Sequence, residues 1–187
     1  MNRRELIKII TLATGGALIG GEFLLSGCKN KNAGKGLLFS ADEIAFLDEV
    51  AETIIPRTNT PGAKDAEVGK FMDLIVHDCY EEKNQKIFKE GINQLNDVCN
   101  KQFNTSFMQC TKEQREKVLI EIDKVAKEYQ QKKKKEDPPY YYTMIKQLTL
   151  FGYFTSKPGA TQALRYIAVP GKWDGCVPYT KGEKAWA

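Results

Sequence analysis

The sequence contains a single histidine, His77, among 187 residues. One imidazole excludes a metal site with several histidine ligands, and it excludes a bis-histidine haem site formed by this chain alone. The five cysteines include no Cys-x-x-Cys pair, which excludes the usual zinc ribbon, the thioredoxin motif and covalent haem attachment. Most chemistries that a chain performs with its own side chains are therefore removed at the outset.

The sequence also lacks the motifs that hold nucleotides and catalytic metals. It has no G-x-x-x-x-G-K-[ST] segment, no H-E-x-x-H pair and no G-x-G-x-x-G that follows a strand. A cysteine–histidine nucleophile pair would need His77, and Cys79 lies at a helical spacing that points the two side chains apart. We therefore predict no catalytic residue, no cofactor and no metal ion bound by this chain.

Neither sign of charge is in large excess. Lys and Arg number 28 against 24 Asp and Glu, and the signs are interleaved. A nucleic-acid-binding protein usually has a more lopsided balance or a basic stripe, so no nucleic-acid partner is expected. Hydrophobic residues make up 42% and charged residues 28% of the chain, which is typical of a soluble globular domain.

The first 27 residues have the layout of an export signal. A short basic segment is followed by a weakly apolar stretch over Ile9–Gly21 and then by small residues. Arg3 and Arg4 near the start resemble the twin-arginine signal, a route that carries folded proteins, often with a cofactor or partner already bound. We predict a signal peptide over residues 1–27.

Leu25-Ser26-Gly27-Cys28 looks like a bacterial lipoprotein box. That resemblance implies cleavage before Cys28 and a diacylglycerol group on its sulfur, and two or more acyl chains give stable anchoring. Residues 28–37 would form a tether to the domain. We expect an exported lipoprotein anchored on the periplasmic side of a bacterial cell envelope. The alternative is an uncleaved N-terminal anchor helix in which the arginine pair is accidental.

Helical signals dominate the rest of the chain, residues 38–187. A capping box at Ser40 and Glu43 predicts a helix over residues 41–54, and another at Thr111 and Gln114 begins a helix that ends near residue 131. Apolar spacing predicts three more helices and one short one. These cover residues 65–80, 84–102, 140–153 and 161–165, with a turn over residues 152–160. The fold class is all-α: a single helical bundle with an irregular C-terminal tail rich in glycine, proline and aromatic residues.

Apolar stripes predict which side chains these helices bury. In the second helix the stripe is Val68, Phe71, Met72, Ile75 and Cys79, and in the third it is Phe88, Ile92, Leu95 and Cys99. The fourth carries Val118, Leu119, Ile122, Val125, Ala126 and Tyr129, and the fifth carries Met144, Ile145, Leu148 and Phe151. The tail over residues 166–187 has no such period. It must therefore lie on its own bundle or on another chain.

Four cysteines remain once Cys28 carries lipid, and an exported chain meets oxidising conditions. Four cysteines allow three pairings. Cys99 and Cys110 flank one short loop, so we favour a Cys99–Cys110 disulfide together with a Cys79–Cys176 disulfide that ties the tail to the bundle. The alternative is that the four are free thiols.

Five parts of the chain are informative together. They are Ala51-Glu52-Thr53-Ile54-Ile55-Pro56, Thr60-Pro61-Gly62-Ala63, Val68-Gly69-Lys70-Phe71, Gly152-Tyr153-Phe154-Thr155-Ser156, and a tail with Pro170-Gly171, Gly175-Cys176-Val177-Pro178 and Ala185-Trp186-Ala187. In this order and spacing they resemble the gluconate 2-dehydrogenase subunit 3 family. The resemblance covers most of residues 38–187.

The resemblance implies a small, non-catalytic subunit of a membrane-associated sugar or sugar-acid dehydrogenase. The large subunit in that family is a flavoprotein of the glucose–methanol–choline type, which holds FAD, and many complexes add a cytochrome c. The large subunit often travels with the exported small one. The lipoprotein box departs from the typical case and puts the cytochrome in doubt as the only anchor.

The leading hypothesis is an accessory subunit that binds, stabilises and co-exports such a flavoprotein and holds it at the membrane. The residues expected at the partner interface are Pro56, Pro61, Tyr153, Pro170, Trp173, Pro178 and Trp186. The alternatives are a free-standing helical lipoprotein that binds a small ligand, and an enzyme that uses cysteines or scattered carboxylates such as Cys176 or Glu52.

Overall fold

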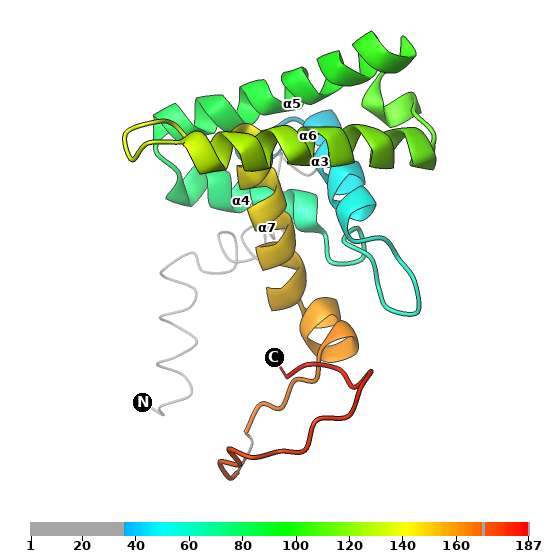
Figure 1. Cartoon of the computed structure of the whole chain (residues 1–187), viewed down its shortest axis with the longest axis vertical. Helices are drawn as coiled ribbons and strands as arrows, with labels where there is room; N and C mark the ends of the chain where they lie inside the picture. The colour runs from blue at the N-terminus through cyan, green and yellow to red at the C-terminus, as the bar shows by residue number, and fades with distance from the viewer. Residues whose placement is uncertain (1–35, 170, 187) are drawn as a thin grey trace, which may run out of the picture. The chain divides into compact units, whose positions relative to one another are not determined.

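The computed structural model of the chain describes residues 36–169 and 171–186 (Figure 1). The predicted signal peptide with Arg3 and Arg4, the predicted lipidation site Cys28 and the predicted interface residue Pro170 lie outside the described residues. None of the helices in the described part is long and apolar enough to span a bilayer.

The described residues form helices joined by short loops, which confirms the all-α fold class. The helices are α3 (Ala41–Ile54), α4 (Val68–Cys79), α5 (Glu82–Phe103), α6 (Lys112–Lys132) and α7 (Tyr141–Thr155), with the single turns η1 (Phe107–Gln109) and η2 (Gly159–Ala163). The only β-type pairing among them is an isolated bridge between Arg165 and Trp186.

Local signals set the helix starts. Ser40 accepts a hydrogen bond from the Glu43 N–H at 3.2 Å, and the Glu43 carboxylate accepts one from the Ser40 N–H at 2.8 Å. Thr111 and Gln114 make the same reciprocal pair at the start of α6. Both capping boxes satisfy main-chain donors that have no partner within the helix, so both predicted starts are confirmed.

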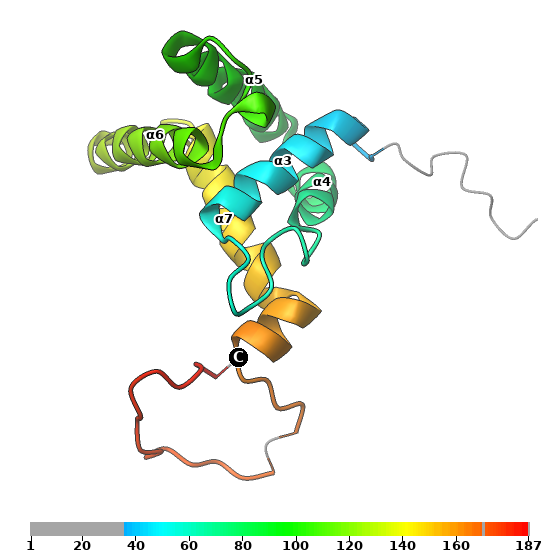
Figure 2. The ribbon, with the colours of Figure 1, turned by 90° about the vertical axis from the view of Figure 1, so that its right-hand side faces the viewer.

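Helix α7 is the centre of the bundle. It contacts α3, α4, α5, α6 and η2, and it runs from beneath α5 and α6 to η2 and the tail (Figures 1 and 2). Its buried side chains include Met144, Ile145 and Leu148, as predicted, and they meet apolar side chains from every other helix. Burial of this shared core stabilises the fold through the hydrophobic effect. The buried side chains from the other helices include Leu47, Val50, Val68, Met72, Leu95, Val118 and Ile122.

A carboxylate lies on the buried face of α4. Asp73 is only 4% exposed, and it accepts main-chain N–H bonds from Leu37 at 2.7 Å, Leu38 at 2.9 Å and Phe39 at 2.8 Å. Buried charges persist where hydrogen bonds satisfy them. Asp73 therefore fastens the segment that precedes α3 along α4.

Some predicted faces were wrong. Cys79, Val125 and Phe151 are exposed although the stripes placed them in the core, and Phe71, Ile75 and Tyr129 are only half-buried. In α4 the buried face is rotated toward Val76 and Asp73, because the chain before α3 covers that side.

The turn predicted over residues 152–160 was also partly wrong, because α7 continues to Thr155. Gly152 serves close packing rather than a turn: a Cβ there would lie 2.5 Å from a ring carbon of Phe71. The short helix predicted at residues 161–165 is instead η2, which begins at Gly159 and ends at Ala163.

Candidate functional site

The loop between α3 and α4 (residues 55–67, the α3–α4 loop) is held in one shape by Glu52. Its carboxylate accepts the N–H of Arg57 at 2.8 Å and the N–H of Lys64 at 2.9 Å. Gly62 lies against the same carboxylate, and a Cβ there would come within 2.4 Å of both oxygens. The glycine therefore lets the loop close around the end of α3.

A second carboxylate orients the cation on this loop. Asp65 accepts hydrogen bonds from the Gly62 N–H at 2.8 Å and from Arg57 Nε at 2.9 Å, and it also pairs with Arg57 Nη2. The Arg57 hydrogen bond, followed by that of Gly62, holds the pKa of Asp65 below its usual value, and Asp65 raises the pKa of Arg57. Both groups stay charged, and the guanidinium is fixed while its side chain remains 67% exposed.

The end of α7 is hydrogen-bonded to the same loop. Tyr153 is 2% exposed, and its hydroxyl donates a 2.6 Å hydrogen bond to the Pro61 carbonyl oxygen. Gly159 brings η2 close to α7: a Cβ at this position would lie 1.9 Å from the Tyr153 carbonyl oxygen. Lys157, Pro158 and Gln162 are thereby placed beside the α3–α4 loop.

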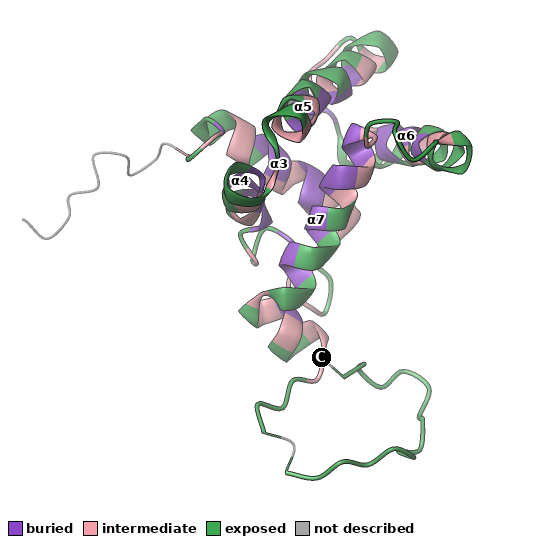
Figure 3. Ribbon diagram, turned by 90° about the vertical axis from the view of Figure 1, so that its left-hand side faces the viewer, coloured by how far each residue is buried: buried purple, intermediate pink, exposed green. Residues whose placement is uncertain are grey.

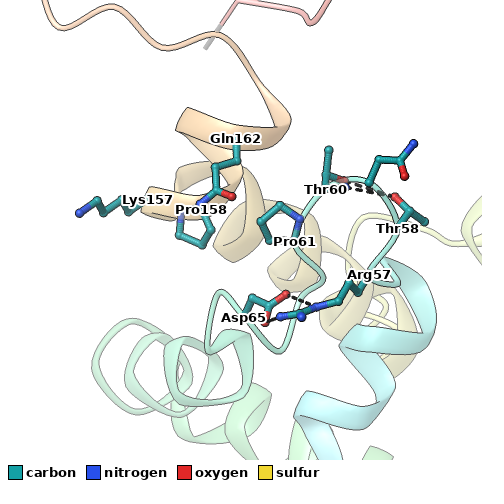
Figure 4. A pocket seen from close by; sticks show the side chains of 9 residues that line it. Arg57, Thr58, Thr60, Pro61, Asp65, Lys157, Pro158 and Gln162 are labelled. Atoms are coloured by element: carbon teal, nitrogen blue, oxygen red, sulfur yellow. Dashed lines mark hydrogen bonds and ion pairs between the residues drawn. The ribbon is translucent and has the colours of Figure 1, made fainter.

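These two segments enclose a hollow of about 530 Å³ on the surface (Figure 4). We call it the polar hollow, because most of its lining is polar. The polar lining residues are Arg57, Thr58, Asn59, Thr60, Lys157 and Gln162, with Asp65 bound to Arg57. Pro61 and Pro158 form apolar walls. The hollow contains two cations and one carboxylate, and its other polar side chains are hydroxyls and amides.

The tail forms a closed loop (residues 165–186, the tail loop). Its two ends meet where the Arg165 N–H donates to the Ala185 carbonyl at 2.8 Å and the Arg165 guanidinium lies 3.8 Å from the centre of the Trp186 ring. Glu183 adds a contact to Arg165 at 3.7 Å. Almost every described residue between these ends is exposed (Figure 3).

The predicted interface residues fall into two groups. Pro61 and Tyr153 come together, and Tyr153 supports the loop from inside rather than presenting its ring to solvent. Pro56 is half-buried in the same loop. Trp173, Pro178 and Trp186 belong to the tail loop, where Trp173 is 91% exposed and Trp186 lies under Arg165.

Cys99 and Cys110 are brought together in the core. Burial, and then the neighbouring Cys110 thiol, raise the pKa of Cys99 to about 12. Cys79 and Cys176 are exposed, and all four are free thiols in this structure. Both predicted disulfides stay predictions, with the Cys99–Cys110 pair placed side by side. Across residues 36–169 and 171–186, no group of three or more His, Cys, Asp and Glu side chains could hold a metal ion.

Sequence reasoning did not single out Arg57, Lys157 or Gln162. They come from segments about a hundred positions apart, and no local spacing predicts that α7 and η2 meet the α3–α4 loop. The bond that joins the two segments runs from Tyr153 to the main chain of Pro61, and a main-chain acceptor leaves no mark in the sequence.

A protein-family model described as gluconate 2-dehydrogenase subunit 3 matches residues 41–171. The match spans α3 to η2 and the beginning of the tail loop, which is more than half of the chain. No curated protein matches the chain significantly, and neither does any solved structure.

Proposed function

The chain belongs to the gluconate 2-dehydrogenase subunit 3 family, and from this we propose that it binds, stabilises and co-exports a flavin-dependent sugar or sugar-acid dehydrogenase and holds it at the membrane. The proposed partner is a flavoprotein large subunit of the glucose–methanol–choline type with bound FAD, and a cytochrome c subunit is a further candidate. The proposed anchor is lipid on Cys28, and the proposed export signal contains Arg3 and Arg4.

The observation that carries this proposal is the exposure of the tail loop. Trp173, Tyr179 and Val169 are among the most exposed large hydrophobic side chains in the described part of the chain. Large aromatic side chains dominate the binding free energy of protein interfaces, and exposed apolar groupings mark interaction surfaces. A partner that covers the tail loop would remove this apolar surface from water.

The geometry beside the tail loop supports the same interpretation. Glu52, Asp65 and Tyr153 fix the α3–α4 loop before any partner arrives. A surface that is already ordered loses less conformational entropy on binding. The fixed loop and the exposed tail loop are joined through η2, so one partner could contact both.

Co-purification from the native host tests the proposal. An affinity tag inserted between Lys135 and Glu136, in the exposed turn before α7, leaves both surfaces unmodified. We expect the tagged chain to capture one large subunit whose FAD is measured by fluorescence after denaturation. A chain that is exported and folded but captures no flavoprotein would overturn the proposal.

Paired variants locate the contact. Trp173→Ala with Tyr179→Ala should reduce the captured FAD at least about tenfold, because interface aromatics are frequent hot spots. The matched control is Ile120→Ala with Val125→Ala, which removes exposed apolar side chains from α6 instead and should leave the captured FAD unchanged. Equal capture by both double variants would exclude the tail loop as the main contact.

Export and anchoring need separate variants. Arg3→Lys with Arg4→Lys should retain both subunits in the cytoplasm if the chain carries the export signal for the pair. Cys28→Ser should release the active complex from the membrane fraction. Membrane-bound activity in the Cys28→Ser strain would show that another subunit supplies the anchor.

A further inference from the structure

We propose that the polar hollow receives an acidic side chain of the flavoprotein large subunit, so that the docking surface combines an apolar contact with a charged one. This inference rests on the proposed function and adds the chemistry of the partner surface that meets residues 57–61 and 157–162.

The hollow is rich in hydrogen-bond donors. Arg57 uses Nε and Nη2 to hold Asp65, and its Nη1 donates to no group within the described residues. Lys157 is exposed and forms no ion pair there either. Asn59 and Gln162 also line the hollow, and their side-chain amides form no hydrogen bond within the described residues. A carboxylate satisfies such donors better than a neutral or basic group does.

The charge of the hollow favours the same occupant. The lining contains two cations, Arg57 and Lys157, and one carboxylate, Asp65, which is already bound to Arg57 and to the Gly62 N–H. Lys157 lies on the other side of the hollow and extends away from the Arg57–Asp65 pair (Figure 4). Asp65 holds the guanidinium in a fixed plane, and a planar fork that is already oriented loses less entropy when it binds a second carboxylate. Another cation in the hollow would be repelled, so the complementary surface is acidic.

The hollow is also continuous with the proposed apolar contact. Gln162 belongs to η2, and its main-chain carbonyl accepts a hydrogen bond from Lys184, close to the end of the tail loop. The hollow and the tail loop are therefore adjacent, and one partner surface can contact both. In such an arrangement the aromatic side chains contribute most of the affinity, and the charged contact fixes the orientation and speeds association.

The test adds negative charge to the hollow without disturbing the Arg57–Asp65 pair. Lys157→Glu with Gln162→Glu changes two exposed side chains whose charged or amide groups have no partner in the described residues. The matched control is Lys89→Glu with Gln130→Glu, which makes the same charge change at exposed positions on α5 and α6. Capture of the FAD-containing large subunit by the tagged chain is measured at several salt concentrations, with circular dichroism as the check on folding.

At low salt the hollow variant should capture at least about tenfold less flavoprotein than the control, because like charges at a contact disfavour binding. As the salt concentration rises, the unchanged chain should capture less flavoprotein, since salt screens exposed charges. For the same reason, the amounts of flavoprotein captured by the hollow variant and by the control should become more alike. Equal capture by hollow and control variants would overturn the inference while leaving the proposed function intact. Absence of flavoprotein with the unchanged chain would overturn both.

Discussion

The hydroxyl of Tyr153 donates a hydrogen bond to the main-chain carbonyl of Pro61, 92 positions earlier in the sequence. This bond joins the last turn of α7 to the α3–α4 loop. The loop lines the polar hollow, and α7 holds the loop in place from inside the bundle. The central helix of the bundle thus fixes the shape of the candidate docking surface.

Tyr153→Phe should lower the free energy of unfolding by about 1–2 kcal/mol. The ring stays in place, but the Pro61 carbonyl loses its donor, and an unsatisfied partly buried acceptor has a cost of this size. Urea unfolding measures the change. Tyr166→Phe is the control, because Tyr166 is exposed and its hydroxyl has no partner in the described residues; this variant should differ from the unchanged chain by less than about 0.5 kcal/mol. Equal stabilities of the two variants would show that the bond contributes nothing.

Asp73→Asn should destabilise the fold by about 1.5–3 kcal/mol, which is the usual contribution of hydrogen bonds to a charged group. One of the two acceptor oxygens becomes an amide nitrogen, and the contacts to Leu37, Leu38 and Phe39 cannot all persist. Hydrogen exchange should become faster at the N–H groups of residues 37–39. Asp97→Asn on the exposed side of α5 is the matched change, and faster exchange at residues 37–39 in this variant as well would argue against a specific role for Asp73.

Asp73 also illustrates what the sequence could and could not predict. The starts of α3 and α6 followed from Ser40/Glu43 and Thr111/Gln114, because a capping box involves residues three positions apart. Asp73 was missed because its hydrogen-bond donors lie more than thirty positions away, and a carboxylate on a helix is otherwise expected to face solvent. Phe151 was misplaced for a related reason: its ring packs edge to face against Phe71, 80 positions earlier, while remaining exposed.

The candidate site also has one part that the sequence could predict and one part that it could not. The glycine, proline and aromatic content of the tail predicted a segment without a core of its own, and the tail loop is exposed. The convergence of Arg57 and Lys157 could not be predicted, since it depends on how η2 turns back at Gly159 toward the α3–α4 loop.

The reduced chain should lose stability as the pH rises above about 9. Burial raises the pKa of Cys99 from its ordinary value of 9.0 to about 12, so between these values the folded chain keeps a proton that the unfolded chain releases. Stability then falls with rising pH, because the folded state binds more protons. Burial also raises the pKa values of Tyr141 and Tyr142, which act in the same direction.

Urea unfolding of the reduced chain at pH values from 8 to 11 measures this slope. Cys99→Ala should show a shallower decline, whatever its stability at pH 8, because it removes one of the buried groups that must ionise. Cys176→Ala removes an exposed thiol and should keep the slope of the unchanged chain. A slope that is the same in all three proteins would assign the decline to other groups.

The contact between Arg165 and Trp186 should keep the tail loop closed. Arg165→Met preserves much of the side chain but removes the guanidinium that lies over the indole and contacts Glu183. An exposed cation–π contact contributes about 0.5–1 kcal/mol, so the open form should become about two to five times more populated. Chymotrypsin cleavage after Trp173 or Tyr179 should accelerate by the same factor when opening is fast relative to cleavage. Global stability should hardly change, since these residues lie outside the core. Lys172→Met is the control, because it removes a cation from the same loop without touching the closure, and equal acceleration in both variants would show that charge, not the Arg165–Trp186 contact, governs access to the loop.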